Sequence, residues 1–382
     1  MGIKILKFGG SSVETLEKME YVAKKVIKEK EKNDEKYVIV VSAMGKKTKN
    51  LYENAKRIAK NPRGRELDLL LATGEIVAIS YLGIILNDLG YKAIALTGKD
   101  ARIYTSGAFQ SSKIINIDTS VIKKHLDLDE IVIVAGYQGV NENGDITTLG
   151  KEGSDTTAIN LAYYLNGDCT IYTDVNYVYE VDPKIIKDAM PHKQLSFLDL
   201  LAFAKAGAKV IAKSAIEFAY TKKINFSIKS TFVETEGTYV GDFVRKDFVG
   251  ITSIDNVYLV KNNLTKSFQE ELLKDGITIE NYGEYLAIYS NDYYDYKYPY
   301  ALPNLKMVTI VGKIVNNIEI QKQILQILAT VCKVYFSYHK ENSFSIFINK
   351  EEDFHLINKL YYFIKERLLW IKLNLQFLGL VA

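Results

Sequence analysis

The sequence predicts an α/β protein with a mostly parallel sheet in its first two thirds and a smaller α+β region in its last third. From residue 1 to about residue 230, β-branched apolar runs alternate with stretches of helical periodicity, which is typical of strands covered by helices. Two of the runs, YVIVV and IVIVA, are apolar throughout, which indicates strands that are buried on both faces. Beyond residue 247 strands and helices follow in a different order.

In the first part each expected strand ends beside a polar or glycine residue. Ligands of open parallel sheets bind at the carboxyl ends of the strands, so we expect a site there. The candidates at these ends are Lys7, Ser42, Thr97-Gly98, Gly136 and Thr173-Asp174. The expected strands are residues 3–8, 37–41, 92–96, 131–135, 169–173 and 224–229, and a helix is expected over residues 13–31.

The second part predicts strand–helix–strand–strand, repeated imperfectly, as in small ligand-binding modules. A polar connector at residues 231–247 separates two expected domains, residues 1–240 and 248–382. The tyrosine-rich segment 291–304 is either a binding surface or a packed connector. The expected strands are residues 250–260, 285–290, 307–312, 334–338, 344–349 and 373–378, and the expected helices are 266–274, 319–329 and 353–368.

Composition narrows the functional class. Hydrophobic residues make up 48% of 382 and the formal net charge is +3, which supports large cores and gives no reason to expect a nucleic-acid or membrane partner. The two cysteines, Cys169 and Cys332, fit a reducing compartment, and we expect a cytoplasmic protein without a visible signal peptide. The apolar run 76–86 is too short to span a bilayer, so we expect a helix buried in the α/β sandwich.

Residues 147–183 contain the strongest chemical signal. A turn rich in Gly, Thr and Ser, residues 150–157, leads into a helix with one apolar face that Asn166-Gly167 ends. A strand then ends on Asp174. A helix N-terminus has free N–H groups and partial positive charge that suit anions, and a carboxylate suits Mg²⁺ or a polar edge of a nucleotide. Together they indicate phosphoryl transfer to a small acid.

The N-terminus repeats this arrangement. Lys7 lies near the end of the first strand, and Gly9-Gly10 turn the chain into a helix. Glycines let the backbone approach a polyphosphate closely, and the lysine adds a point charge. The GxxxxGK[ST] spacing of a P-loop is absent, and so is the GxGxxG of a dinucleotide-binding turn.

Eight segments of residues 3–240 carry a recognisable pattern: KFGGSSV (7–13), VVSAMGKKT (40–48), ATGE (72–75), AGYQGV (135–140), TTLGKEGSDTTA (147–158), IYTDVNYVYEVDP (171–183), GAKVI (207–211) and SIKS (227–230). In this order they resemble the aspartokinases of the amino-acid kinase fold. That resemblance implies a three-layer αβα sandwich, and the C-terminal third is similar to tandem ACT modules, which are ferredoxin-like. Relatives in the fold phosphorylate glutamate, acetylglutamate, carbamate or UMP.

The resemblance implies transfer of the γ-phosphoryl group of ATP to the β-carboxylate of L-aspartate, the first step towards lysine, threonine and methionine. No general base is needed, because a carboxylate is already ionised at neutral pH. Mg²⁺ is implied as cofactor, without a dedicated metal site of side chains. The resemblance implies that Lys7, Lys209 and Asp174 are catalytic residues. The ATP-binding residues would be Lys7, Gly9, Gly10, Thr173, Asp174, Tyr179, Lys184, Lys209 and Val210. The substrate-binding residues would be Ser42, Thr48, Glu75, Lys151, Gly153 and Ser154, and Glu75 would pair with the substrate ammonium.

The chain departs from the family pattern in the substrate loop. Lys151-Glu152 stand where relatives carry Arg-Gly, and a lysine cannot form the two parallel hydrogen bonds of an arginine. Asp155 is either a catalytic residue or an ordinary helix cap. The departure keeps two alternatives open, a kinase with another acidic substrate and a degenerate regulatory homologue. The ACT-like region lacks the family's glycine-bearing turn near residues 262–265, so we expect a homo-oligomer with weak or altered feedback control.

Overall fold

The computed structural model describes residues 2–150, 152–274, 277–289, 302–349 and 355–377. The predicted segment 291–304 therefore lies largely outside the described residues. The chain divides into two compact units, each described here by itself. The first contains Met1–Val178, Pro191–Leu201 and Val210–Val244, and the second contains Tyr179–Met190, Ala202–Lys209 and Arg245–Ala382. The functional roles assigned to residues 1–240 and 248–382 remain predictions.

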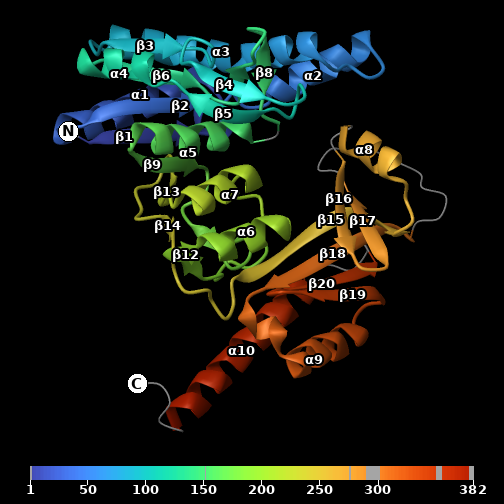
Figure 1. Ribbon diagram of the computed structural model, residues 1–382. Helices are drawn as coiled ribbons and strands as arrows, with labels where there is room; N and C mark the ends of the chain where they lie inside the picture. Colours follow the sequence, from blue (N-terminus) through green and yellow to red (C-terminus); the bar gives the residue numbers. More distant parts are fainter. Residues whose placement is uncertain (1, 151, 275–276, 290–301, 350–354, 378–382) are drawn as a thin grey trace. The chain divides into compact units, whose positions relative to one another are not determined.

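The first unit is a three-layer αβα sandwich, as predicted (Figure 1). Its eight-stranded sheet has the order β12-β14-β13-β9-β1-β2-β6-β3, and every neighbouring pair is parallel except β13 with β14. Its strands are β1 (Ile3–Phe8), β2 (Lys36–Val41), β3 (Ala93–Leu96), β6 (Ile131–Ala135), β9 (Asp168–Thr173), β12 (Gln194–Ser196), β13 (Phe226–Ser230) and β14 (Thr238–Gly241).

Helices cover both faces of this sheet. On one face α1 (Leu16–Lys32) and α3 (Arg65–Asp88) form a core with alternate residues of β1, β2 and β6. On the other, α5 (Gly153–Leu165) packs on β1, β2 and β9 with α7 (Lys213–Lys222) beside it. The remaining helices of this unit are α2 (Lys47–Ile58), which packs on α3, and α4 (Ser120–Asp127), which packs on β6.

The N-terminal helix begins later than predicted. A 3₁₀ turn, Gly10–Val13, follows β1, and α1 starts at Leu16 because the Thr15 hydroxyl accepts a hydrogen bond from the N–H of Lys18. In contrast, α5 begins within the predicted turn, at Gly153, and ends as predicted at Asn166, which is left-handed with φ 53°.

Helix α3 contains the apolar run 76–86 within a longer helix. Among the described residues it is the one helix with the length and apolarity to cross a membrane, and about half of its most apolar window is buried. Ala78, Ile79, Leu82 and Leu86 belong to the sheet core. This burial agrees with the prediction of a sandwich helix.

A small four-stranded sheet of order β5-β4-β7-β8 was not predicted from the sequence. Its strands have at most five residues, too few to show a clear period. They are β4 (Ile103–Ser106), β5 (Lys113–Ile117), β7 (Gln138–Val140) and β8 (Ile146–Thr148). The remaining elements before residue 244 are β10 (Val178–Tyr179), β11 (Pro191–His192) and α6 (Phe197–Lys205), and the chain passes from one unit to the other at residue 179, at residue 191 and within α6.

The second unit has one six-stranded sheet of order β16-β17-β15-β18-β20-β19, antiparallel throughout. The order β15-α8-β16-β17 followed by β18-α9-β19-β20 agrees with the predicted strand–helix–strand–strand repeat, although β16 was not among the predicted strands. The first strands of the two repeats pair at the centre of the sheet. The elements are β15 (Gly250–Lys261), α8 (Lys266–Lys274), β16 (Thr278–Tyr282), β17 (Tyr285–Tyr289), β18 (Leu302–Val311), a 3₁₀ turn (Lys313–Asn316), α9 (Ile318–Ala329), β19 (Val334–Lys340), β20 (Ser343–Asn349) and α10 (His355–Phe377).

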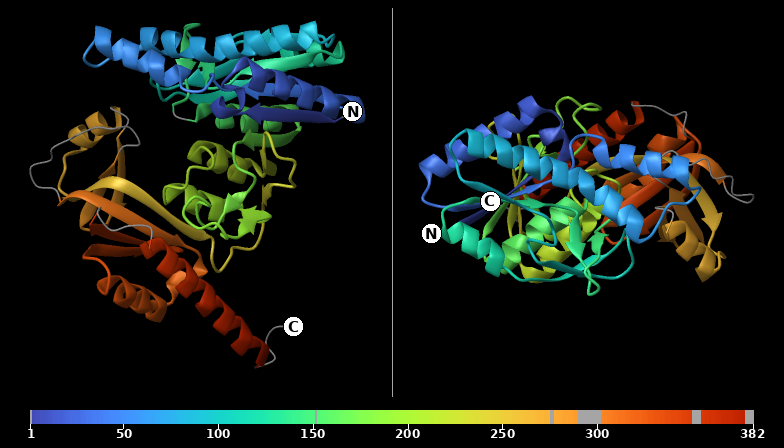
Figure 2. Two further views of the ribbon diagram at one scale, coloured as in Figure 1. Left: turned by 180° about the vertical axis from the view of Figure 1, so that it is seen from behind. Right: turned by 90° about the horizontal axis from the view of Figure 1, so that it is seen from above.

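The predicted final strand, residues 373–378, is wrong. Residues up to Phe377 belong to α10, which Figure 2 shows as one continuous helix. Alternation of apolar and polar residues suggested a strand, but no Gly or Pro interrupts residues 355–377, so a helix already anchored by packing propagates through them. Leu356, Leu360 and Ile364 fix α10 in the core of this unit.

Candidate active site at the carboxyl edge of the parallel sheet

The turns after β1 and β2 are held against each other in the first unit. The N–H of Gly45 donates to the carbonyl of Gly10 at 3.0 Å, and the N–H of Ser42 donates to the carbonyl of Phe8 at 3.1 Å. A Cβ atom on Gly10 would lie 2.8 Å from the carbonyl oxygen of Ala43. Only glycine allows this approach, so the glycine turn is fixed beside the end of β2.

Lys7 points from β1 to the α5 side of the sheet. Its Nζ lies 2.6 Å from Oδ1 of Asp155 in the first turn of α5, and the two side chains are 12% and 5% exposed. The other carboxylate oxygen of Asp155 accepts from the N–H of Ala212 at 3.1 Å. Asp155 is therefore the partner of the predicted catalytic lysine rather than a helix cap, and it joins β1 to the segment before α7.

The N-terminus of α5 meets the end of β6. A Cβ atom on Gly136 would lie 2.6 Å from Cβ of Ser154, so the helix start lies directly on the strand end. Gly153 and Ser154 are buried, and Lys151 lies outside the described residues. Glu152, just before α5, has φ 60° and ψ 23°. This is the left-handed region that favours glycine, which gives a physical reason for the family glycine at this position.

Glu75 on α3 carries a buried carboxylate. It is 3% exposed, and its Oε1 accepts from the N–H of Ala43 at 3.0 Å. Oε2 has no hydrogen-bond partner among the residues that the structure describes. Burial raises the pKa of Glu75 to about 8. Thr48 is near, because a Cβ atom on the adjacent Gly74 would lie 3.6 Å from its hydroxyl.

Thr173 and Asp174 follow β9 on the same edge of the sheet. The Thr173 hydroxyl donates to Asp174 Oδ1 at 3.2 Å, and Asp174 is exposed. The carbonyl of Thr173 accepts from the N–H of Thr231, whose hydroxyl lies 2.6 Å from that of Ser12 in the turn after β1. The ends of β9 and β13 are thereby linked to the glycine turn.

The other predicted ATP-binding residues are placed in two groups. Val210 is half-buried in the first unit, whereas Tyr179, Lys184 and Lys209 belong to the second. Within the second unit, Tyr179 packs partly against the core under α9 and α10, and Lys184 and Lys209 are exposed.

The first unit thus brings together a glycine turn, a buried lysine, a helix N-terminus and a buried carboxylate with a free oxygen. The first three attract anions, and the fourth attracts an ammonium group once it is ionised. Sequence reasoning did not find the pairing of Asp155 with Lys7, although its position in the first turn of a glycine-led helix marks it as a polar group near anions.

The profile of the amino acid kinase family matches residues 2–230, and the chain belongs to this family. Among its relatives, aspartokinase from Geobacillus stearothermophilus is 46% identical over 245 residues, 64% of this chain and 60% of that protein. Aspartokinase from Helicobacter pylori is 36% identical over 284 residues, 73% of this chain and 69% of that protein.

The chain spans about three fifths of the length of the Geobacillus aspartokinase that it matches. Solved structures cover more of the chain. E. coli aspartokinase III in complex with aspartate and ADP matches with a TM-score of 0.75 over 94% of this chain and 99% of that chain, at 19% identity. Aspartate kinase from Synechocystis matches with a TM-score of 0.57 over 91% of this chain and 66% of that chain, at 27% identity. The fold class of the first unit is confirmed.

Proposed function

We propose that the chain is an aspartokinase that transfers the γ-phosphoryl group of ATP to the β-carboxylate of L-aspartate, giving 4-phospho-L-aspartate. The observation that carries this proposal is the buried carboxylate of Glu75. This carboxylate lies beside the glycine turn, because the N–H of Ala43 donates to its Oε1 and the carbonyl oxygen of Ala43 lies against Gly10. An acceptor that carries both an ammonium and acid groups satisfies Glu75 and the anion-attracting groups together, whereas carbamate, acetylglutamate and UMP lack the ammonium.

In this proposal the residues act by position and charge. Lys7, Gly9 and Gly10 bind the ATP phosphates, with Thr173, Asp174, Tyr179, Lys184, Lys209 and Val210 as further nucleotide-binding residues. Lys7, Lys209 and Asp174 offset the charge that develops at the transferred phosphoryl group. Ser42, Thr48, Glu75, Lys151, Gly153 and Ser154 bind aspartate.

Mg²⁺ is part of the same proposal. Within the described ranges no three acidic, His or Cys side chains gather into a metal site, and Asp174 is an exposed single carboxylate. A single carboxylate suits Mg²⁺, which usually binds one or two protein carboxylates and completes its coordination shell with phosphate oxygens and water. When it is bound, Mg²⁺ would neutralise negative charge on the phosphates. We further propose a cytoplasmic homo-oligomer assembled through the ACT-like second unit, with weak or altered feedback control.

A hydroxamate assay for acyl phosphate tests the activity. The chain is incubated with ATP, Mg²⁺ and L-aspartate, and in parallel with glutamate, N-acetylglutamate or carbamate. Product from aspartate is expected to fall by about 10² or more in Lys7→Ala. Lys4→Ala is the matched control, because Lys4 lies on the same strand but pairs with exposed Asp168.

Product from a different acid would replace aspartate as the substrate. No product from any acid, together with a thermal shift on ATP binding, would indicate a regulatory homologue instead.

A further inference from the structure

A second buried carboxylate lies on α3, two turns before Glu75, and the predicted site does not include it. Asp68 is 0% exposed. Its oxygens accept from the backbone N–H of Gln110 at 3.1 and 3.2 Å and from Gln110 Nε2 at 2.6 Å. They also accept from the N–H of Thr148 at 2.8 Å and from its hydroxyl at 2.7 Å. Four donor groups from two distant segments thus converge on one side chain, and no ion pair reaches it among the described residues.

Gln110 cannot readily rearrange around Asp68. Its side chain also bridges the start of α3, where Nε2 donates to the carbonyl of Gly64 at 2.9 Å and Oε1 accepts from the N–H of Gly64 at 3.1 Å. Both ends of the amide are therefore assigned by their partners. The turn between β4 and β5 is clamped to the helix that carries Asp68.

Thr148 is the last residue of β8 and is fully buried. Besides its two bonds to Asp68, its carbonyl accepts from the N–H of Ser112 at 3.0 Å. All three of its polar groups are thus engaged. Immediately after it, a Cβ atom on Gly150 would lie 3.2 Å from the carbonyl oxygen of Gln110, so the chain leaves β8 against the turn that Asp68 holds.

Leu149, Gly150 and Glu152 are the described residues of the loop between β8 and α5, which leads to Gly153 and Ser154. The far end of this loop is held by Asp155, through Lys7 and Ala212. The near end is held by Asp68, through Thr148. Two buried aspartates from different helices therefore determine where the loop begins and where it ends.

We propose that Asp68 is a positioning residue that fixes the end of β8 and Gly150, and thereby the approach of the chain to Gly153 and Ser154, where the acceptor substrate binds. The proposal rests on the proposed function, because that function assigns Gly153 and Ser154, at the start of α5, to the acceptor. Asp68 itself does not touch the reacting groups. Its effect passes through Thr148 to the loop.

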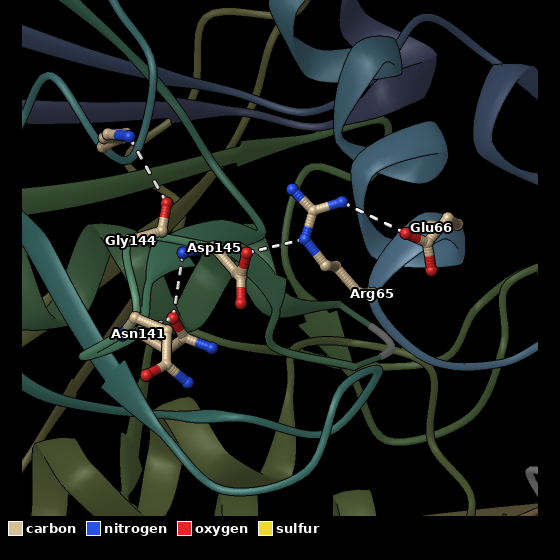
Figure 3. A network of polar contacts seen from close by, with 7 residues as sticks. Arg65, Glu66, Asn141, Gly144 and Asp145 are labelled. Carbon is tan, nitrogen blue, oxygen red and sulfur yellow. Dashed lines mark hydrogen bonds and ion pairs between the residues drawn. The ribbon is translucent and has the colours of Figure 1, made fainter.

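A matched control lies at the same junction. Arg65, one turn before Asp68, donates through Nε to Asp145 at 2.6 Å, and Asp145 precedes β8 (Figure 3). The N–H of Asp145 also donates to Asn141. This pair joins the same two elements, but Arg65 is 52% exposed, and exposed ion pairs contribute little. Asp145→Asn therefore tests whether any weakening of this junction has the same effect.

The experiment compares Asp68→Asn with the wild type and with Asp145→Asn. The asparagine keeps the volume and one acceptor oxygen, but its NH₂ group faces N–H donors and leaves at least one of them unsatisfied. We expect KM for L-aspartate to rise about tenfold or more while KM for ATP stays within about twofold. We also expect amide hydrogen exchange to accelerate in the peptide covering residues 147–155. Asp145→Asn should change neither readout.

A purely structural role for Asp68 would lower Tm and the active fraction, and hence kcat, while leaving KM for aspartate unchanged; that result would overturn the proposal. If Asp68→Asn does not fold, Thr148→Val removes one of the bonds to Asp68 without a change of volume. An increase of about threefold or more in KM for aspartate would then support the proposal, and an unchanged KM would refute it.

Hydrogen exchange separates this proposal from the proposed function. Faster exchange of residues 147–155 in a protein that phosphorylates no acid would leave the positioning role intact and refute the activity. Unchanged exchange in an active Asp68→Asn variant would refute the positioning role alone.

Discussion

Binding of L-aspartate is expected to become stronger as the pH rises from 6.5 to 8, because the carboxyl of Glu75 must lose a proton before it pairs with the substrate ammonium. Burial raises the pKa of Glu75 to about 8. At pH 6.5 the ionised fraction is then about 3%, and at pH 8 it is about one half. Since affinity is reduced by the fraction of competent protein, Kd should fall about 16-fold over this interval.

Isothermal titration calorimetry in two buffers of different ionisation enthalpy measures this coupling directly. At pH 7 binding should release about 0.9 proton from Glu75 per aspartate bound. Glu75→Gln should bind aspartate weakly at every pH and release no proton from this position. Succinate, which has the two carboxylates without the ammonium, is the control ligand and should bind no better at pH 8 than at pH 6.5.

A wild-type Kd that stays constant from pH 6.5 to 8, with no proton release, would show that Glu75 is already ionised in the free protein and would refute the reasoning. Stability supplies an independent check. A native pKa above the unfolded value means that the folded chain holds a proton which the unfolded chain has lost. The free energy of unfolding should therefore decline by up to about 1.4 kcal/mol per pH unit between about pH 4.5 and 8, and Glu75→Gln should lack this slope.

Three further predictions concern charges and backbone conformation. Asp155→Asn leaves Lys7 buried without its partner and should lower the free energy of unfolding by about 3–5 kcal/mol. In calorimetry the double variant Lys7→Met/Asp155→Asn should recover part of this stability but no activity. An Asp155→Asn variant as stable as the wild type would contradict this prediction. Glu152→Gly should raise the free energy of unfolding by about 0.5–1 kcal/mol, because residue 152 has a left-handed φ of 60°, whereas Glu152→Ala should give no such gain. Equal Tm values for the two variants would show that backbone conformation is not the cause. Lys365→Met removes a hydrogen-bond donor to Glu180, which is 8% exposed, and should destabilise the second unit by about 1–3 kcal/mol. Urea unfolding, monitored by the fluorescence of the single tryptophan on α10, measures this change. Lys359→Met, at an exposed position of α10, is the control, and equal unfolding midpoints for the two variants would refute the role of the Lys365–Glu180 pair.

Much of the fold could be predicted because the relevant signals are local. The apolar runs, the glycine turn after β1 and the Asn166 stop depend on residues within one or two turns of each other, and the structure confirms the parallel sheet, its helices and the repeat of the second unit. The wrong prediction of a strand at residues 373–378 also came from a local signal. Residues 373–378 alternate like a strand, but the packing of Leu356, Leu360 and Ile364 anchors a helix that extends through Phe377.

The sequence by itself determined where the chemistry-bearing residues gather, because the carboxyl ends of parallel strands meet at one edge of a sheet. Only the tertiary structure decided which of them are partners. Asp155 pairs with Lys7 across 148 positions of the chain, and Asp68 binds Thr148 across 80. The physical reason is burial: a carboxylate removed from water must find donors wherever the folded chain brings them, and sequence spacing carries no record of that choice.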